Sequence, residues 1–374
     1  MSLPLRIGIN ALYLIPGGVG GTEIYLRSLL EALPEIDDRN EYFIYANAET
    51  CSDLAPSSPR FHFVQTGVKA RVRPARILYE QVMLPRLLRR DAIEVLLNAG
   101  FTCPLSFADR SVTVFYDLQH KRHPEFFRWF DRPFWNLLLR ASAVKSRALI
   151  VVSRATESDL VRYYPEAKNK TFVVPVGVDP EFFRIAERRI RAATSEPYLL
   201  TVSTLHPHKN LDRLLQAFAE FRRSRPEFRL VIAGLKGFAT EALEERRRNL
   251  GLEDSVRFTG WIPREELYLL YQHADACVAP SEFEGFGMPL SEALAAGIPA
   301  ACSTIEPFDE IAGDAAVRFA PDSIAEMVDA MKVITSDPDF RARARSAGPI
   351  RARLFDWHNS ARSMLEVMEK AAGH

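Results

Sequence analysis

The sequence predicts an α/β protein built from two doubly wound parallel sheets. Short apolar runs alternate with helical patterns along the whole chain, which is typical of parallel α/β architecture. The run ADACVAPS (274–281), for example, is of the kind that forms a strand buried on both faces. At 374 residues the chain exceeds what one hydrophobic core normally supports, so two domains are expected.

Each half of the chain contains its own series of predicted strands. In the first half, helices such as TEIYLRSLLEAL (22–33) and the aromatic-rich stretch 126–143 separate runs at 5–12, 42–47, 61–66, 93–99, 111–117, 148–153 and 171–178. In the second half, the runs lie at 198–204, 228–234, 255–262, 276–281, 298–303 and 316–320. The segment 179–197 has no strong period and ends in a proline, so we place the domain boundary there, between residues 1–180 and 181–354.

Composition narrows the class of protein. Apolar residues make up 47% and charged residues 26%, which is ordinary for a globular chain. The net charge is zero, which argues against a nucleic-acid binder. No signal-peptide pattern or long apolar run is present, and the four scattered cysteines are expected to be buried thiols in a reducing compartment. We therefore expect a cytoplasmic protein.

The most informative segment is SEFEGFGMPLSEALAAGIP (281–299). Glu284 lies in a glycine-containing loop and Glu292 lies one turn into the helix that follows. Pro289 suits a first helical position, and Gly297 is expected to end the helix. A strand end, a glycine loop and a helix start in this order predict a site for an anionic, hydroxyl-rich ligand. Its oxygens would meet the loop formed by Gly285, Phe286, Gly287 and Met288.

This segment resembles the signature of the family-4 retaining nucleotide-sugar glycosyltransferases, which have the GT-B fold: two Rossmann-like domains that face a central cleft. The resemblance covers nearly the whole chain at the level of motif order. It implies that Glu284 lies by the donor sugar and that Glu292 holds the ribose. It also implies an acceptor-binding first domain, a nucleotide-sugar-binding second domain, and a last helix, within 355–374, that crosses back onto the first. The alternative for Glu292 is a solvated carboxylate favoured by the helix dipole.

Two further loops are candidates for the donor's phosphates. PGGVGGTE (16–23) is not a dinucleotide fingerprint, because its third glycine position falls on Glu23. The resemblance implies that Gly20 or Gly21 faces the phosphates, while a tight turn without a ligand is the alternative. Lys209 is expected at a helix start, with Asn210 as the N-cap, where a cation suits a departing diphosphate. The family often has an arginine upstream of this lysine; here His206 or His208 would substitute in part, and a plain surface lysine is the alternative.

The acceptor side is less clearly marked. After the strand 111–117 the family often has His-Asp, whereas this chain has Tyr116 followed by Asp117. His120 and His123 come next, and loop histidines are commonly only solvated. We assign Asp117 a catalytic role, and Tyr116 and His120 to the acceptor side.

The chemistry implied is a retaining transfer in which the leaving diphosphate accepts the acceptor's proton. Positive charge at Lys209 would stabilise that phosphate. No D-x-D stands at a strand edge, and Asp337-Pro338-Asp339 is interpreted as a helix cap, so we expect neither a metal nor a cofactor. Trp261 and Ile262 occupy the place where the family seats the base.

A basic aliphatic stretch, residues 68–90, has seven basic residues against one glutamate. An amphipathic helix packed on its own domain is one interpretation. Peripheral contact with anionic lipid headgroups is the other, which would suit a lipid-linked acceptor.

The resemblance thus implies a metal-independent retaining hexosyltransferase. The passages YDLQHKRHPEFF and LHPHKNLDRLLQAF are most similar to bacterial mannosyltransferases of polysaccharide assembly. GDP-mannose is the first donor considered, followed by UDP-glucose or another nucleotide sugar, with a glycan or lipid-linked acceptor. The rival is a non-catalytic sugar-nucleotide-binding protein, favoured only by Tyr116 and the missing arginine. A dehydrogenase is disfavoured because the glycine fingerprint fails.

Overall fold

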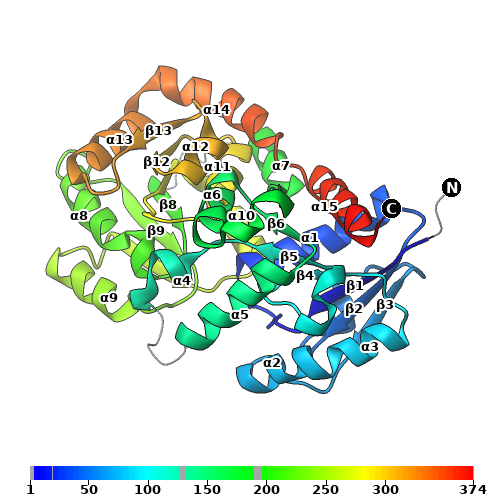
Figure 1. Ribbon diagram of the computed structural model, residues 1–374. Helices are drawn as coiled ribbons and strands as arrows, with labels where there is room; N and C mark the ends of the chain where they lie inside the picture. The colour runs from blue at the N-terminus through cyan, green and yellow to red at the C-terminus, as the bar shows by residue number, and fades with distance from the viewer. Residues whose placement is uncertain (1–3, 19, 127–131, 189–195, 374) are drawn as a thin grey trace. The chain divides into compact units, whose positions relative to one another are not determined.

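The computed structural model describes residues 4–18, 20–126, 132–188 and 196–373. It divides the chain into two compact units, Met1–Gly177 with Phe355–His374, and Val178–Leu354. Each unit is an α/β layer structure around one parallel sheet (Figure 1). No helix among the described residues is both long enough and apolar enough to cross a bilayer.

The first unit contains a seven-stranded parallel sheet in the order β3-β2-β1-β4-β5-β6-β7. Its strands are β1 (Arg6–Ala11), β2 (Glu41–Ala46), β3 (Phe61–Gln65), β4 (Val95–Asn98), β5 (Ser111–Phe115), β6 (Ala148–Val151) and β7 (Thr171–Val173). Its helices are α1 (Gly21–Ile36), α2 (Arg73–Val82), α3 (Leu84–Arg90), α4 (Gln119–Arg122), α5 (Arg132–Lys145), α6 (Arg154–Tyr163) and α15 (Trp357–Ala372).

The second unit contains a six-stranded sheet in the order β10-β9-β8-β11-β12-β13. Its strands are β8 (Tyr198–Val202), β9 (Arg229–Ala233), β10 (Val256–Gly260), β11 (Ala276–Ala279), β12 (Ala300–Ser303) and β13 (Ala316–Phe319). Its helices are α7 (Pro180–Arg188), α8 (Leu211–Arg222), α9 (Thr240–Asn249), α10 (Arg264–His273), α11 (Met288–Ala295), α12 (Glu306–Ala312), α13 (Ile324–Ser336) and α14 (Pro338–Ala352).

In both parallel sheets the order in which successive strands are added reverses near the middle, and the points of reversal are where such sheets usually bind ligands. In the first sheet β1 pairs with both β2 and β4, and in the second β8 pairs with both β9 and β11. The connections on the two sides of such a point leave the sheet in opposite directions, which opens a crevice beyond the strand ends. The predicted fold class, two doubly wound α/β domains, is confirmed.

The last helix, α15, belongs to the first unit and packs along α1, as the red and blue helices of Figure 1 show. Ala361, Leu365 and Met368 are buried there, as their helical spacing predicted. Trp357, the first residue of the helix, packs so closely on Gly177 that a side chain at 177 would collide with its ring.

Three expectations about local structure were wrong. Residues Pro180–Arg188, expected to lack a period, form the amphipathic helix α7, which buries Phe182 and Ile185. The strand expected over 171–178 is shorter: β7 covers only Thr171–Val173. Cys51 is exposed, whereas the other three cysteines are buried as predicted. The helix expected over 126–143 is α5, which begins at Arg132; residues 127–131 of that stretch lie outside the described part of the chain.

Candidate active site

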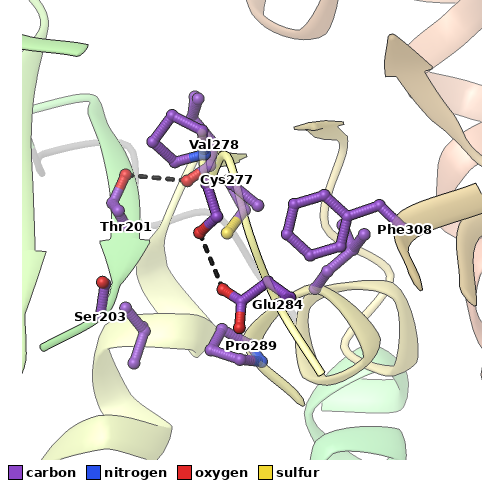
Figure 2. A pocket seen from close by; sticks show the side chains of 12 residues that line it. Thr201, Ser203, Cys277, Val278, Glu284, Pro289 and Phe308 are labelled. Carbon is purple, nitrogen blue, oxygen red and sulfur yellow. Dashed lines mark hydrogen bonds between the residues drawn. The ribbon is translucent and has the colours of Figure 1, made fainter. Parts of the chain in front are cut away.

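A pocket lies at the reversal point of the second sheet, beyond the ends of β8 and β11. Residues 201–203 and 277–281 line two of its sides, and Pro289, Leu290 and Phe308 from α11 and α12 close it. The Glu284 side chain lies between Thr201 and Ser203 on one side and Phe308 on the other (Figure 2). This is the position at which open α/β sheets bind their ligands.

Lys209 and Glu284 form an ion pair at this pocket. The Lys209 Nζ donates to Glu284 Oε1 over 2.7 Å, and the two side chains are only 16% and 15% exposed. Ser281 Oγ also donates to Oε1, at 2.8 Å. The other oxygen, Oε2, accepts no hydrogen bond from the residues that the structure describes. A carboxylate held by a cation on one oxygen and open on the other is suited to accept a hydrogen bond from a ligand hydroxyl.

Glycine is required where α11 begins. Gly287 has φ of 116°, and a Cβ there would lie 2.5 Å from the Phe308 ring. Gly287 and Met288 therefore stand at the start of α11, where the first N–H groups of a helix have no acceptor within the helix and favour an anion.

Asn210 occupies the predicted N-cap position of α8, but its side chain does not cap the helix. Asn210 precedes α8, but its backbone is left-handed, with φ of 57°, and its side chain makes no cap hydrogen bond. Its Nδ2 instead donates to the carbonyls of Pro280, at 3.0 Å, and Pro321, at 2.7 Å. Asn210 thus ties the Lys209 turn to the loop that follows β11.

Glu292 lies in a second cluster of charged and phenolic groups. It is 5% exposed, its Oε2 accepts from the Tyr271 hydroxyl at 2.9 Å, and its Oε1 lies 3.7 Å from Arg264 Nη1. Burial raises the pKa of the Glu292 carboxyl, while Arg264 and the Tyr271 hydrogen bond oppose that rise. The interpretation of Glu292 as a solvated first-turn carboxylate is therefore wrong.

Arg264, which the sequence reasoning missed, is the centre of this cluster. Its Nη2 donates to Asp179 Oδ2 at 2.9 Å, and its guanidinium lies 5.4 Å from the centre of the Phe182 ring. Tyr268 also donates to Asp179. The first residue of α10 thus links Glu292 on α11 to the segment that leads into α7. Helical spacing gives no signal for such a residue, since Arg264 belongs to no apolar stripe.

The predicted histidines lie beside Lys209. His208 is buried and His206 is half-buried, with their rings stacked 5.8 Å apart. Burial and the Lys209 charge lower the pKa of His206, so its imidazole is neutral near pH 7 and adds no cation. Trp261 is 60% exposed after β10, next to the half-buried Ile262.

In the first unit, the predicted glycine loop lies between β1 and α1, and Tyr116 and Asp117 directly follow β5. Gly20 has φ of 60° with open space around it, and Gly21 begins α1. Tyr116 is buried, packs edge-to-face against Tyr25, and donates to the Ala99 carbonyl at 2.9 Å. Its position is that of a core side chain with a satisfied hydroxyl.

Asp117 and the two loop histidines have separate partners. Asp117 is half-buried and accepts from the Gln119 N–H at 2.9 Å. His120 Nε2 lies 3.0 Å from the Tyr164 hydroxyl, and burial together with Lys121 lowers the pKa of His120 to about 4. His123 Nδ1 contacts Glu125 at 3.0 Å. His120 is therefore neutral at physiological pH.

The D-x-D sequence near the C-terminus caps a helix, as predicted. The Asp337 carboxylate accepts from the N–H groups of Asp339 and Phe340 at the start of α14. Both donors belong to the backbone, which is the usual N-cap arrangement.

A cation–carboxylate pair at the reversal point of a doubly wound sheet, next to a glycine-led helix start, has the chemistry to bind a phosphorylated, hydroxyl-rich ligand. Two doubly wound α/β domains in one chain are the architecture of the GT-B class of glycosyltransferases. Residues 183–351 match the family model "Glycosyl transferases group 1", and residues 19–182 match "Glycosyltransferase Family 4". The chain belongs to this glycosyltransferase family, as its motifs predicted.

Curated relatives include transferases of several substrates. O-antigen chain mannosyltransferase B of Escherichia coli is 25% identical over 67% of this chain and 68% of its own length. The mannosyltransferase RfbU of Salmonella typhimurium is 28% identical over 74% of this chain and 76% of its own. Glycogen synthase of Mycobacterium tuberculosis is 32% identical over 60% of this chain, which spans only 54% of that relative.

Solved structures show the same fold at low identity. Sucrose-phosphate synthase from Thermosynechococcus elongatus has a TM-score of 0.80 at 19% identity, with 98% of each chain covered. WaaG, a glycosyltransferase involved in lipopolysaccharide biosynthesis, has a TM-score of 0.75 at 16% identity, covering 98% of this chain and 100% of its own.

Proposed function

We propose that this glycosyltransferase is a retaining, metal-independent hexosyltransferase that transfers mannose from GDP-mannose to a glycan or lipid-linked acceptor in polysaccharide assembly. The two O-antigen mannosyltransferases among the relatives support mannose as the transferred sugar. A UDP-sugar is the second candidate, because a neighbour of the same fold, Anabaena Alr3699/HepE, was solved with UDP and glucose.

The Lys209–Glu284 pair is the observation that supports transfer most strongly. With the donor diphosphate near Lys209 and the helix start at Gly287, the bond between the sugar's anomeric carbon and the phosphate oxygen breaks. The electron pair leaves with the diphosphate, whose charge Lys209 and the N–H groups stabilise. The acceptor oxygen attacks from the same face, and its proton passes to the departing phosphate oxygen, so the anomeric configuration is retained.

The two glutamates have different proposed roles. The open Oε2 of Glu284 accepts hydrogen bonds from the sugar hydroxyls or stabilises the cationic character of the transition state. Glu292 accepts from the ribose hydroxyls, held in place by Arg264 and Tyr271. Gly285 and Phe286 complete the donor loop, and Trp261 and Ile262 contact the base.

The first unit is proposed to supply the acceptor side through Asp117, with Tyr116 and His120 nearby, and Gly20 and Gly21 at the phosphates. Among these, Asp117 is the best candidate for contact with an acceptor hydroxyl, because it is a half-buried carboxylate at a strand end. A lipid-linked acceptor would bring the enzyme to the cytoplasmic face of a membrane.

The rival function is sugar-nucleotide binding without turnover. Tyr116 in the place of the family histidine favours it, whereas the intact Lys209–Glu284 pair opposes it. The two functions make different demands, since only an enzyme must break the sugar–phosphate bond.

A nucleotide panel followed by a transfer assay tests the proposal. GDP should raise the thermal midpoint more than UDP, ADP or NAD, since a ligand at a hundred times its dissociation constant adds about 2.7 kcal/mol of stability. GDP-mannose with a mannosylated acceptor should then release GDP. Preference for UDP would shift the donor to the second candidate, and binding without release of nucleotide would establish the rival function.

A further inference from the structure

Helices α2 and α3 form a nearly continuous rod on the first unit. They are separated only at Met83, whose backbone stays helical and whose carbonyl accepts from the N–H groups of Arg86 and Leu87. One stripe of this rod, consisting of Ile77, Glu80, Leu84 and Leu88, is buried against the unit. This spacing of three and four residues defines a single inward face.

The opposite face exposes large apolar side chains. Leu78 is 65% exposed, Val82 44% and Met83 39%, and Val72, just before α2, is 50% exposed. A surface helix normally presents polar groups on its outer face. Four large aliphatic side chains gathered within twelve residues are therefore unusual for a surface that faces only water.

Exposed arginines surround this apolar stripe. Arg71, Arg73, Arg86, Arg89 and Arg90 are all exposed. The guanidinium of Arg73 lies 5.0 Å from the centre of the Trp135 ring, which brings the start of α5 beside the start of α2.

The carboxylates near the stripe are either buried or paired with arginines. Glu80 is 4% exposed and accepts from Asn10 and Thr102 inside the unit, and Asp91 is paired with Arg90 at 2.7 Å. Glu49 lies 3.9 Å from Arg71 and is 23% exposed. The outer face is thus both apolar and strongly basic.

We propose that this α2 face (Val72, Leu78, Val82 and Met83, with Arg71, Arg73, Arg86 and Arg89) binds the surface of an anionic phospholipid bilayer. The helix lies in the plane of the interface, its aliphatic side chains enter the boundary between headgroups and acyl chains, and the guanidinium groups contact lipid phosphates. Nucleic acid would engage the arginines but leave the aliphatic stripe in water. A second copy of the chain would oppose one arginine cluster to another. The inference does not depend on the donor or on catalysis.

Co-sedimentation of the full chain with vesicles tests this surface. Binding is expected to vesicles rich in phosphatidylglycerol, to weaken as salt is raised, and to be much weaker with phosphatidylcholine alone. Arg86→Ala with Arg89→Ala should lower partitioning roughly tenfold or more, because each basic residue near an anionic surface contributes about fivefold. Leu78→Ser with Val82→Ser should also lower it about tenfold, through lost apolar burial.

Matched substitutions elsewhere control for charge and hydrophobicity. Arg223→Ala with Arg248→Ala removes two exposed arginines from the second unit, and Ile350→Ser removes an aliphatic side chain that is 68% exposed. These variants should bind vesicles like the wild type, with thermal midpoints that show all variants to be folded. Equal losses in the control variants, or binding indifferent to lipid charge, would overturn the proposal. So would a dimer of the wild-type chain that the Leu78 and Val82 substitutions dissociate, since that would make the face a protein interface.

Discussion

Lys209 and Glu284 are 75 positions apart in the sequence, yet they form one partly buried ion pair. Each was predicted separately as a site residue, the lysine because it follows a strand and the glutamate because it lies in a glycine-containing loop. Their contact follows from topology, because β8 pairs directly with β11 although two strands intervene in the sequence. A local pattern could not reveal that pairing, nor that Arg264 would face Glu292.

The two glutamates should fail in different ways when altered. Because Glu292 is buried against Arg264 and Tyr271, we choose the isosteric change Glu292→Gln, which preserves volume. It should weaken binding of the bare nucleoside diphosphate by about 1.5–3 kcal/mol, since hydrogen bonds to a charged acceptor are lost. Glu284→Gln should leave that affinity nearly unchanged while transfer collapses. Titration calorimetry with the nucleoside diphosphate measures both, and equal losses of affinity would show that the roles are assigned wrongly.

His120 should make the stability of the first unit sensitive to acid. Its folded-state pKa of about 4 lies below the usual value of about 6.5. Between these values the unfolded chain binds a proton that the folded chain does not, so the contribution is complete above pH 6.5 and declines as the pH falls toward 4. The thermal midpoint of the wild type should therefore drop more between pH 7 and pH 5 than that of His120→Gln. An imidazole that titrates near 6.5 by NMR would contradict this prediction.

At the scale of elements, α11 depends on the glycine that begins it. Gly287→Ala adds a Cβ 2.5 Å from the Phe308 ring at a φ of 116°, so we expect a loss of about 1–3 kcal/mol in stability and weaker donor binding. Gly251→Ala is the matched control, because Gly251 also has positive φ, 63°, but open space around it. Thermal unfolding of both variants compares them. Similar losses would mean that backbone strain alone, without the contact with Phe308, accounts for the effect.

Helix α7 and the turn at Asn210 could not be predicted from the neighbouring sequence alone. α7 was missed because its nine residues, PEFFRIAER, are too short a stretch to establish a helical period, although the Phe182 ring centre lies 4.9 Å from that of Tyr271 and Ile185 is buried. Asn210 was expected to cap α8 because asparagine is a good N-cap, but tertiary hydrogen bonds to Pro280 and Pro321 hold it in a left-handed conformation instead. In both cases contacts distant in sequence decide the local structure.

At the scale of the whole molecule, the repeated alternation of strand and helix was sufficient to predict two doubly wound domains. The order of the strands in each sheet could not be predicted, because an apolar run indicates a strand but not which other strands pair with it. The reversal at β8 and β11, on which the site depends, became visible only in the fold.

The proposed metal independence is tested on the complete enzyme. With Lys209 and helix N–H groups available to stabilise the leaving diphosphate, saturating EDTA should leave the transfer rate almost unchanged. The assay compares initial rates with and without chelator, using a metal-free donor preparation. A loss of rate restored by Mn²⁺ or Mg²⁺ would contradict the proposed chemistry.

The proposed function requires the Lys209–Glu284 site to transfer a sugar with retention of the anomeric configuration. Proton NMR of the reaction, followed in real time for the wild type and for Lys209→Ala, tests it most directly. We expect the wild type to give a product with the anomeric configuration of the donor. We expect Lys209→Ala to form the same product roughly a hundredfold more slowly or worse, because one preorganised transition-state contact is lost. An inverted product, or a folded Lys209→Ala variant with a near-normal rate, would contradict it.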